Sequence, residues 1–295
     1  MSLALDEIQT CAVLGAGAMG HGIAQLAAQA GFQVQLFDVS PAAVERGLAR
    51  VRQGLDGAVQ KGKLQAADRD QTLARIQPAS ELGALAGAQW VVEAVPEDLA
   101  LKQKLLGELA GLLGSSALLA SNTSSLSLTA IASGLPHPER VIGMHFFNPP
   151  HRMKLLELVL AAQTHPDAVA LARALGERLG KTCIEVRDSP GFASSRLGIC
   201  LAMEAIRMLE AGVASAADID RAMELGYNHP MGPLRLTDLV GLDVRLAIAD
   251  HLRGALDSAV FEAPALLRQR VAEGKLGQKT GEGFHRYGND GKLLN

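Results

Sequence analysis

The sequence contains Gly15-Ala16-Gly17-Ala18-Met19-Gly20, a G-x-G-x-x-G pattern, between an apolar run at residues 11–14 and an alanine-rich stretch at residues 23–30. In a strand–turn–helix unit the first glycine makes the tight turn and the second lets the backbone approach a pyrophosphate. The third glycine lets the helix pack closely against the strand, and the helix N-terminus offers N–H groups to the anion. The pattern therefore predicts a dinucleotide-binding turn whose cofactor contacts are Gly15, Gly17, Ala18, Met19 and Gly20.

A second strand and an acidic residue follow this turn. Gly31 ends the predicted helix, residues 33–37 have strand composition, and Asp38 comes directly after them. A carboxylate at this place accepts hydrogen bonds from the adenosine ribose hydroxyls and repels a 2′-phosphate. We therefore predict that the cofactor is NAD and that Asp38 binds its ribose.

Length and composition limit the class of protein. The chain has 295 residues, of which 48% are hydrophobic and 20% charged, which favours about two folded domains with sizeable cores. The net charge of −3 and the aromatic content of 3% argue against a nucleic-acid partner or an anionic membrane surface.

The three cysteines, Cys11, Cys183 and Cys200, lie far apart in apolar runs and have no metal-ligand spacing. They are typical of buried, reduced thiols, so we expect no disulfide and no metal. Residues 1–9 lack the basic and apolar regions of a secretory signal, and no uncharged apolar run reaches the roughly 18 residues of a membrane span. We expect a cytoplasmic protein.

Residues 41–74 have the apolar spacing of a helix, with breaks expected near residues 54–62. This stretch also carries a locally basic face made of Arg46, Arg50, Arg52, Lys61 and Lys63. Two interpretations remain open: a solvated helix surface, or a binding surface for a polyphosphate tail such as that of coenzyme A.

Polar residues follow three further predicted strands, at residues 90–95, 117–120 and 140–145. The carboxyl ends of parallel strands meet at one edge of a sheet, where folds of this kind bind ligands. We therefore expect Glu97, Ser124 and His145 to lie at the edge that carries the glycine turn.

The character of the sequence changes near residue 188. Beyond it no convincing strand is found, and helices are predicted at residues 192–211, 215–225, 234–256 and 264–273. We therefore predict an α/β Rossmann-like dinucleotide-binding domain at residues 1–187 and an all-α domain at residues 188–295. The second domain is more apolar than its own core requires, so a homodimer through this domain is expected.

His145 and Glu157 are the strongest candidates for catalysis. They lie on the predicted strands at residues 140–145 and 154–160, which a Pro-Pro turn separates. A carboxylate on one imidazole nitrogen fixes the tautomer and stabilises the imidazolium, and the other nitrogen can then take a proton. A histidine with only a structural role is the alternative, and Glu157 makes a general base the favoured interpretation.

At this point the chain resembles the L-3-hydroxyacyl-CoA dehydrogenases over nearly its whole length, especially the short bacterial form similar to 3-hydroxybutyryl-CoA dehydrogenases. Besides the glycine turn with Asp38, the stretches that carry the resemblance are 93–98 (Glu-Ala-Val-Pro-Glu-Asp), 121–125 (Ser-Asn-Thr-Ser-Ser), 145–149 (His-Phe-Phe-Asn-Pro), 189–192 (Ser-Pro-Gly-Phe), 230–233 with 238–241, and 277–284.

The resemblance implies roles for individual residues. His145 would be the general base and Glu157 its orienting partner, Ser124 would bind the substrate oxygen, and Asn148 would help to place the nicotinamide and the acyl group. Glu97, Lys102 and Asn122 would lie on the cofactor side. The family commonly has Asn where this chain has Ser195, which leaves the acyl contact of this substrate-binding position in doubt.

The resemblance implies reversible, NAD-dependent oxidation of the 3-hydroxyl of an acyl-CoA, in fatty acid and acyl-CoA metabolism. One alternative is a dehydrogenase of a free hydroxy or sugar acid, of the gulonate type, on the same scaffold. The other is a non-catalytic NAD-binding structural protein, which the presence of both His145 and Glu157 disfavours.

Overall fold

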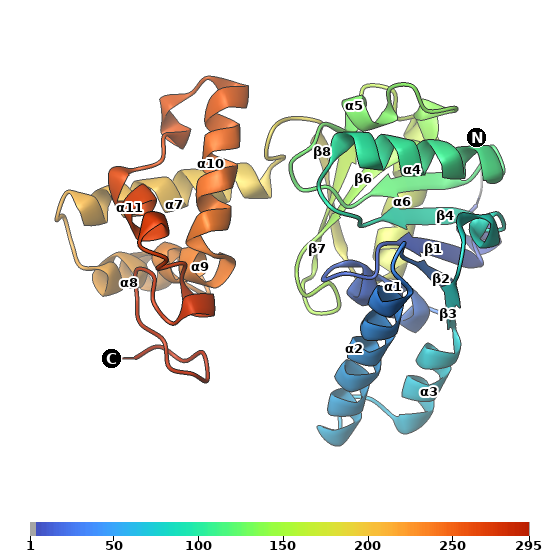
Figure 1. The fold of residues 1–295 in the computed structure, drawn as a ribbon, viewed down its shortest axis with the longest axis horizontal. Helices are drawn as coiled ribbons and strands as arrows, with labels where there is room; N and C mark the ends of the chain where they lie inside the picture. The colour runs from blue at the N-terminus through green and yellow to red at the C-terminus, as the bar shows by residue number, and fades with distance from the viewer. Residues whose placement is uncertain (1–3, 295) are drawn as a thin grey trace. The chain divides into compact units, whose positions relative to one another are not determined.

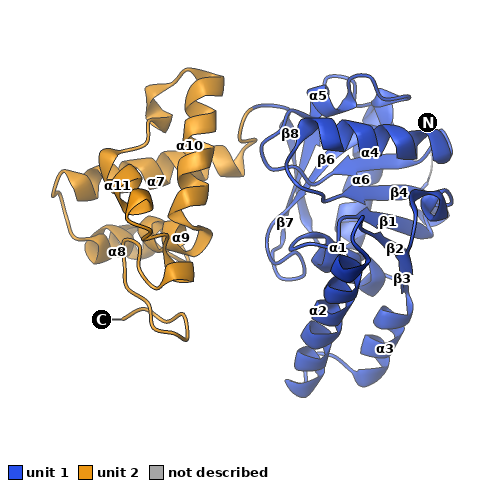
Figure 2. Ribbon diagram, in the orientation of Figure 1, with its two compact units in different colours: residues 1–189 blue, residues 190–295 orange. Residues whose placement is uncertain are grey.

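The computed structural model describes residues 4–294, so the ends of the sequence, including the first three residues of the stretch compared with a secretory signal, lie outside the described residues. The chain forms two compact units, residues 1–189 and 190–295 (Figure 2). The first unit is α/β and the second helical, which confirms the predicted fold class.

The first unit is built on an eight-stranded sheet with the strand order β3-β2-β1-β4-β5-β6-β7-β8 (Figure 1). Neighbouring strands are parallel except β6 and β7, which pair antiparallel. The strands are β1 Thr10–Leu14, β2 Gln33–Phe37, β3 Ile76–Ala79, β4 Trp90–Glu93, β5 Leu118–Ser121, β6 Val141–Phe146, β7 Leu155–Leu160 and β8 Thr182–Arg187.

Helices cover both faces of this sheet. Cys11 and Val13 of β1 belong to a core cluster with side chains of α1, α2 and α6, whereas Ala12 and Leu14, which point the other way, are buried outside it. In Figure 1, α4 lies across the sheet in front and α6 behind it. The helices are α1 Gly20–Gln29, α2 Pro41–Gln60, α3 Ala66–Ala74, α4 Leu99–Leu112, α5 Leu128–Ala132 and α6 Pro166–Arg178.

The first unit departs from the sequence prediction in three places. Helix α2 continues through Gly54 and Gly57 and ends at Gln60, so the helical stretch breaks only at the end of the predicted range, between α2 and α3. Burial of Val51 and Leu55 on the apolar face of α2 outweighs the cost of about 1 kcal/mol for each helical glycine. Strand β3 and helix α5 were not predicted; β3 contains Pro78, which is tolerated because β3 is an edge strand.

The second unit packs its helices around a separate apolar core. The predicted helix over residues 234–256 is in fact two helices, because Gly241 adopts a φ of 106° that side-chain-bearing residues rarely reach. The helices are α7 Ser194–Glu210, α8 Ala216–Gly226, α9 Pro233–Val240, α10 Leu242–Leu256 and α11 Ala265–Ala272. Short 3-10 turns in the two units lie at Leu5–Glu7, Leu82–Leu85, Pro138–Arg140, Ala259–Phe261 and Gln278–Thr280.

Two buried carboxylates fasten the C-terminal segment to these helices. Asp238 of α9 accepts hydrogen bonds from the backbone N–H of Phe284 (2.8 Å), the backbone N–H of His285 (2.8 Å) and the hydroxyl of Tyr287 (2.9 Å). Asp220 of α8 lies 2.8 Å from Nε2 of His285. Burial raises the pKa of Asp238, although its hydrogen-bond donors act in the opposite direction. The segment is thus held by polar bonds in the interior.

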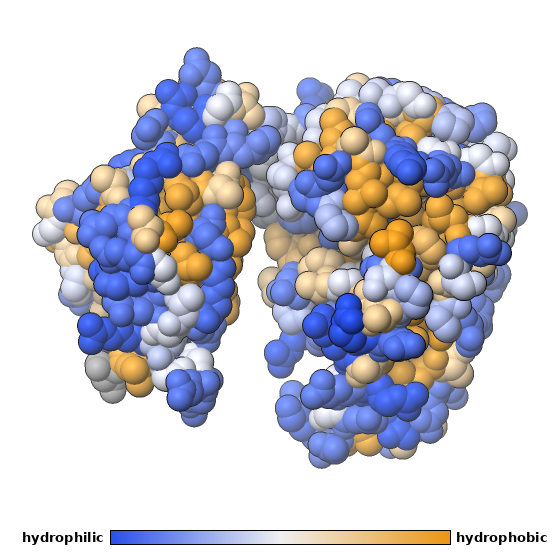
Figure 3. Space-filling model, in the orientation of Figure 1, coloured by the Kyte–Doolittle hydropathy of each residue, from blue (hydrophilic) through white to orange (hydrophobic). Residues whose placement is uncertain are grey.

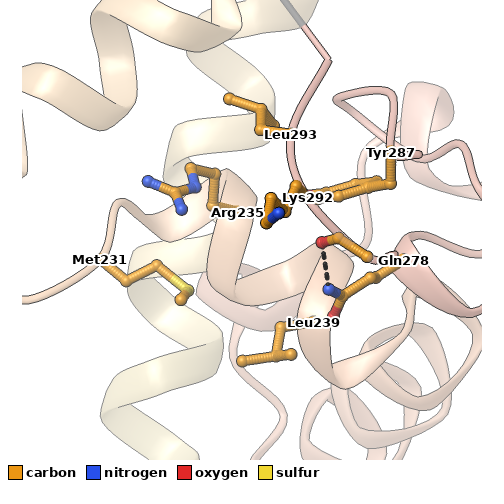
Figure 4. Close-up of a pocket in the computed structure, with 8 residues that line it drawn as sticks. Met231, Arg235, Leu239, Gln278, Tyr287, Lys292 and Leu293 are labelled. Carbon is orange, nitrogen blue, oxygen red and sulfur yellow. Dashed lines mark hydrogen bonds between the residues drawn. The ribbon is translucent and has the colours of Figure 1, made fainter. Parts of the chain in front are cut away.

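The C-terminal segment and α9 together line a pocket of about 360 Å³ (Figure 4). Gln278 forms part of the pocket wall and donates a hydrogen bond from Nε2 to the carbonyl oxygen of Gly291, at 2.6 Å. Apolar and cationic side chains share the lining, among them Met231, Arg235, Leu239 and Lys292.

We predict that Asp238→Ala lowers the free energy of unfolding by about 2–4 kcal/mol, because three donors lose a buried charged acceptor. Asp250→Ala is the control, since Asp250 pairs with Arg268 on the surface and its loss should cost less than about 1 kcal/mol. Urea denaturation measures both; equal effects would show that the buried bonds do not fasten the segment.

Candidate active site

The glycine turn joins β1 to α1, and its first and third glycines are required by the packing of the turn itself. Gly15 has a φ of 94°, and a Cβ there would lie 2.6 Å from the carbonyl oxygen of Ala94. A Cβ on Gly20 would collide with the carbonyl oxygen of Gly15. The turn therefore closes only with glycine at these two positions.

Gly17 has a different environment. A Cβ built at this position meets no atom of the chain within 4 Å, and Gly17 and Ala18 are exposed next to the start of α1, with Met19 half-buried. The fold itself thus gives no steric reason for glycine here. A phosphate group that approaches the backbone N–H groups does give one, so this turn fits the pyrophosphate of a dinucleotide.

Asp38, at the end of β2, lies beside the turn. Its Oδ2 accepts a hydrogen bond from the backbone N–H of Ala16 and its Oδ1 one from Ser40, both at 2.9 Å. Next to it is a pocket of about 500 Å³ whose walls include Pro41 and Val39, the latter 81% exposed. An apolar slot beside a carboxylate at the end of β2 fits the adenine of NAD.

Lys102, on α4, is buried, with only 1% of its side chain exposed. Its Nζ lies 2.7 Å from Oε1 of Glu93, 3.2 Å from Oε2 of Glu97 and 3.3 Å from the carbonyl oxygen of Val95. The resemblance places Lys102 on the cofactor side, whereas its ammonium group binds the two carboxylates in the domain interior. Lys102 thus fixes the loop after β4.

Glu97 connects this loop to the loop after β5. Its Oε1 accepts hydrogen bonds from the hydroxyl of Thr123 (2.7 Å), the N–H of Ser124 (2.9 Å) and the N–H of Ser125 (3.0 Å). Partial burial raises the pKa of Glu97, but these donors and the charge of Lys102 outweigh it, so the pKa lies below its ordinary value. The ionised carboxylate holds Ser124, which is exposed, in place.

His145 and Glu157 face each other across the antiparallel pair β6–β7, where they are directly opposite in register. Nδ1 of His145 lies 2.7 Å from Oε2 of Glu157; the residues are 7% and 0% exposed. Asn122 braces the end of β6, because its Oδ1 accepts a hydrogen bond from the N–H of Phe146 at 2.9 Å. The structure thus brings the predicted pair together, and Asn122 holds the end of β6 beside it.

Asn148 and Ser195 complete the set of predicted site residues. Asn148 is exposed in the loop that follows β6, and Ser195 is a half-buried residue in the first turn of α7, in the second unit. Sequence reasoning gave no role to Glu93 or Ser121, whose hydroxyl donates to Oε2 of Glu93 at 2.6 Å. A charged residue at the end of the apolar strand 90–93 was the signal that could have identified Glu93.

Within residues 4–294, no group of three or more His, Cys, Asp or Glu side chains is arranged to hold a metal ion. Over the same residues, no helix is both long and apolar enough to cross a bilayer.

Comparison with known families agrees with this geometry. Residues 10–189 match the family described as 3-hydroxyacyl-CoA dehydrogenase, NAD binding domain, and residues 191–287 match the C-terminal domain of the same description. The chain belongs to the 3-hydroxyacyl-CoA dehydrogenase family. It is accordingly an oxidoreductase with NAD as its cofactor.

Individual members of the 3-hydroxyacyl-CoA dehydrogenase family are similar over most of this chain. A probable 3-hydroxybutyryl-CoA dehydrogenase of Bacillus subtilis is 43% identical, covering 95% of this chain and 98% of its own length. A 3-hydroxyadipyl-CoA dehydrogenase of Escherichia coli is 41% identical over 95% of this chain and 59% of its own. The crystal structure of (S)-3-hydroxybutyryl-CoA dehydrogenase from Ralstonia eutropha has a TM-score of 0.92 and 42% identity, covering 96% of this chain and 100% of that one.

The different surroundings of the glycines lead to a paired prediction. Gly17→Ala should leave thermal stability nearly unchanged and weaken NADH binding about tenfold or more, because the new methyl group occupies space next to the pyrophosphate. Gly20→Ala should lower the free energy of unfolding by more than about 2 kcal/mol through its collision with Gly15. Thermal unfolding and NADH titration measure the two effects. Normal NADH affinity in folded Gly17→Ala would contradict the assignment of the turn.

Proposed function

We propose that this dehydrogenase oxidises the 3-hydroxyl of an L-3-hydroxyacyl-CoA, such as 3-hydroxybutyryl-CoA, to the 3-ketoacyl-CoA, and catalyses the reverse reaction as well. The observation that carries the proposal is the buried pair of His145 and Glu157 across β6 and β7. The similarity to proteins named 3-hydroxybutyryl-CoA dehydrogenase supports it.

In this proposal His145 is the general base. Its Nδ1 faces Glu157, so Nε2 is the atom that takes the proton from the substrate hydroxyl. Glu157 keeps the imidazole in one tautomer and stabilises the positive charge that develops on it. NAD, when bound, accepts the hydride from C3 of the substrate. Ser124 and Asn148 orient the substrate oxygen and acyl group.

The cofactor is held, in the same proposal, by the glycine turn and by Asp38. Gly15 and Gly20 shape the turn, and the exposed backbone of Gly17, Ala18 and Met19 receives the pyrophosphate. Glu97, Lys102 and Asn122 act on the cofactor side by fixing the loops after β4 and β5. Their role is to keep the binding edge of the sheet in one arrangement.

The acyl-CoA would be bound by the basic face of α2 and by Ser195. Arg52 and Lys61 of the basic face line a pocket of about 920 Å³ next to α2, which supports a site for the polyphosphate tail of coenzyme A. Ser195, as a substrate-binding residue, would contact the acyl group directly or through a water molecule. Relatives are named for acyl groups with and without a terminal carboxylate, so the names alone do not fix the acyl group.

We further propose a homodimer through the second unit. Most of the exposed large apolar side chains belong to this unit, including Leu225 (82%), Tyr227 (75%), Leu197 (70%) and Leu239 (53%). Figure 3 shows apolar atoms exposed on the face of this unit that is in view. Extended apolar surface of this kind is typical of subunit interfaces. For the compartment, the three free cysteines support a reducing one such as the cytoplasm.

The direct test is oxidation of NADH by the purified protein with acetoacetyl-CoA, followed by absorbance. We expect turnover that depends on the thioester, and no reduction of NAD with gulonate. Turnover with gulonate and none with acetoacetyl-CoA would assign the chain to free sugar acids instead.

The role of the paired side chains can be measured separately. His145→Gln should lower kcat by about 10²–10⁴-fold and leave NADH binding largely intact. Glu157→Gln should also lower kcat, because an amide does not stabilise the imidazolium. His165→Gln, at an exposed histidine beside Asp167, is the control and should keep wild-type turnover. Near-normal turnover in His145→Gln would exclude this mechanism.

The choice of cofactor is a further prediction. The wild-type protein should strongly prefer NADH to NADPH, because Asp38 lies where a 2′-phosphate would bring a second negative charge. Asp38→Ala should narrow this preference in kcat/KM. Asp38→Asn retains one acceptor oxygen for the turn and separates the effect of charge from that of the hydrogen bonds. Equal kcat/KM for both cofactors in the wild type would contradict the role of Asp38.

A further inference from the structure

The loop between β6 and β7, residues 147–154, carries exposed basic side chains soon after His145. His151 and Arg152 are exposed, and neither side chain forms an ion pair or a hydrogen bond within residues 4–294. The proposed mechanism uses Asn148 of this loop and gives these two side chains no role. They are therefore available to a ligand of the first unit.

A buried lysine holds this loop in place. Lys181, which is 8% exposed, donates hydrogen bonds from Nζ to the carbonyl oxygens of Pro150 (2.5 Å) and Met153 (2.7 Å). Removing an ammonium group from water is costly unless its hydrogen bonds are replaced, as they are here. The two bonds fix the backbone on both sides of His151 and Arg152, so these side chains extend from a preformed loop.

The loop contacts the first turn of α1, next to the glycine turn. Pro150 packs against Gly22, because a Cβ built on Gly22 would lie 2.9 Å from Cδ of Pro150. His21, one residue earlier on α1, has its Nδ1 2.6 Å from the carbonyl oxygen of Gly17. A carbonyl oxygen only accepts, so Nδ1 is the donor. The His21 ring is thus fixed at the glycine turn, and its neighbour Gly22 contacts the loop.

The charges that act on His151 all have the same sign. Partial desolvation lowers the pKa of His151, and the positive charges of Arg152, His21 and Lys181 lower it further. No acidic side chain of the described residues acts in the opposite direction. Like charges held close together repel one another, so an anion that binds between them relieves this repulsion.

His21 also connects the loop to the basic face of α2. A Cβ built on Gly47 would lie 3.4 Å from Cβ of His21, so α2 passes next to that residue. Arg50 comes three residues after Gly47 and is its neighbour on the surface of the helix. Basic side chains thus extend from α2 past His21 to His151 and Arg152, entirely within the first unit.

Phosphate is the anion that this arrangement fits. Arginine forms short, charge-assisted hydrogen bonds with phosphate oxygens, and a loop that is fixed before binding loses little entropy when the ligand arrives. The pyrophosphate of NAD is assigned to the exposed backbone of the glycine turn, whereas this loop contains Asn148, which is assigned to the substrate. The phosphate groups of coenzyme A are therefore the ligand that we assign to the loop.

We propose that Arg152 and His151 bind a phosphate group of the coenzyme A part of the substrate. This inference rests on the proposed dehydrogenase function, and it adds a second contact region for the coenzyme A tail besides the basic face of α2. The contact is made far from the reacting carbon and is the same before and during hydride transfer. It therefore lowers KM and leaves kcat largely unchanged.

Substrates with and without phosphate groups give the first test. Acetoacetyl-CoA and acetoacetyl-pantetheine carry the same reacting group, and only the former has phosphates. In Arg152→Gln, kcat/KM with NADH should fall about 5- to 50-fold for acetoacetyl-CoA, mainly through KM, because a charge-assisted contact is lost. The value for acetoacetyl-pantetheine should change by less than about twofold. An equal fall with both thioesters, or no fall with either, would overturn the proposal.

Two further variants separate the site from a general effect of charge. Arg173→Gln is the matched control, since it removes the same charge from the first unit at a residue that pairs with Glu185 on the surface. It should leave both kcat/KM values unchanged, and a loss equal to that of Arg152→Gln would overturn the proposal. Arg152→Lys keeps the charge and should retain part of the preference for the phosphorylated thioester.

Binding measurements distinguish coenzyme A from the cofactor as the source of the phosphate. Calorimetric titration with coenzyme A, which needs no turnover, should show a higher Kd in Arg152→Gln, and the Kd of NADH from fluorescence should stay the same. An unchanged Kd for coenzyme A, or weakening of NADH alone, would overturn the proposal. Turnover of acetoacetyl-CoA that Arg152→Gln does not affect would overturn only this site. Absence of turnover with both thioesters in the wild type would overturn the proposed function itself.

Discussion

The binding edge of the first domain depends on the buried ion pair between Lys102 and Glu93. Removing two charges from water is costly, and the cost is offset only when their other hydrogen-bonding atoms are satisfied. Here Ser121 and the N–H of Val95 complete Glu93, and Glu97 completes Lys102. The pair therefore joins α4, the end of β4 and the end of β5 into one polar unit, and the exposed loops of the edge are attached to it.

The pairing of His145 with Glu157 is positioned in another way. Both residues lie within strands, and the backbone hydrogen bonds of the antiparallel pair β6–β7 set their separation. After β6 the chain turns back through a short loop, and only an antiparallel strand can follow so short a connection. Strand β7 therefore brings Glu157 directly opposite His145. The sheet thus fixes the backbone positions of the two residues, and the contact between Nδ1 and Oε2 orients the imidazole.

The sequence allowed prediction of those features that depend on residues close together in the chain. The glycine turn, Asp38 and the facing of His145 and Glu157 depend on short-range chain geometry, and the α/β class of the first unit follows from alternating strands and helices. Two elements of the first unit were missed, since β3 is a short edge strand with a proline and α5 is a short helix. The continuity of α2 and the interior position of Lys102 depend on tertiary packing, which no periodicity reports.

Asp38 has a second function that matters to anyone who wishes to re-engineer the cofactor preference. The carboxylate that is proposed to bind the ribose also accepts hydrogen bonds from the N–H groups of Ala16 and Ser40, so it braces the glycine turn from within the chain. In the proposed binding mode, recognition of the cofactor and order of the turn are therefore coupled through one side chain. A redesign for phosphorylated dinucleotides has to supply a new acceptor for these two N–H groups as well as a new cation, because exchanging the charge alone loosens the loop that must hold the pyrophosphate.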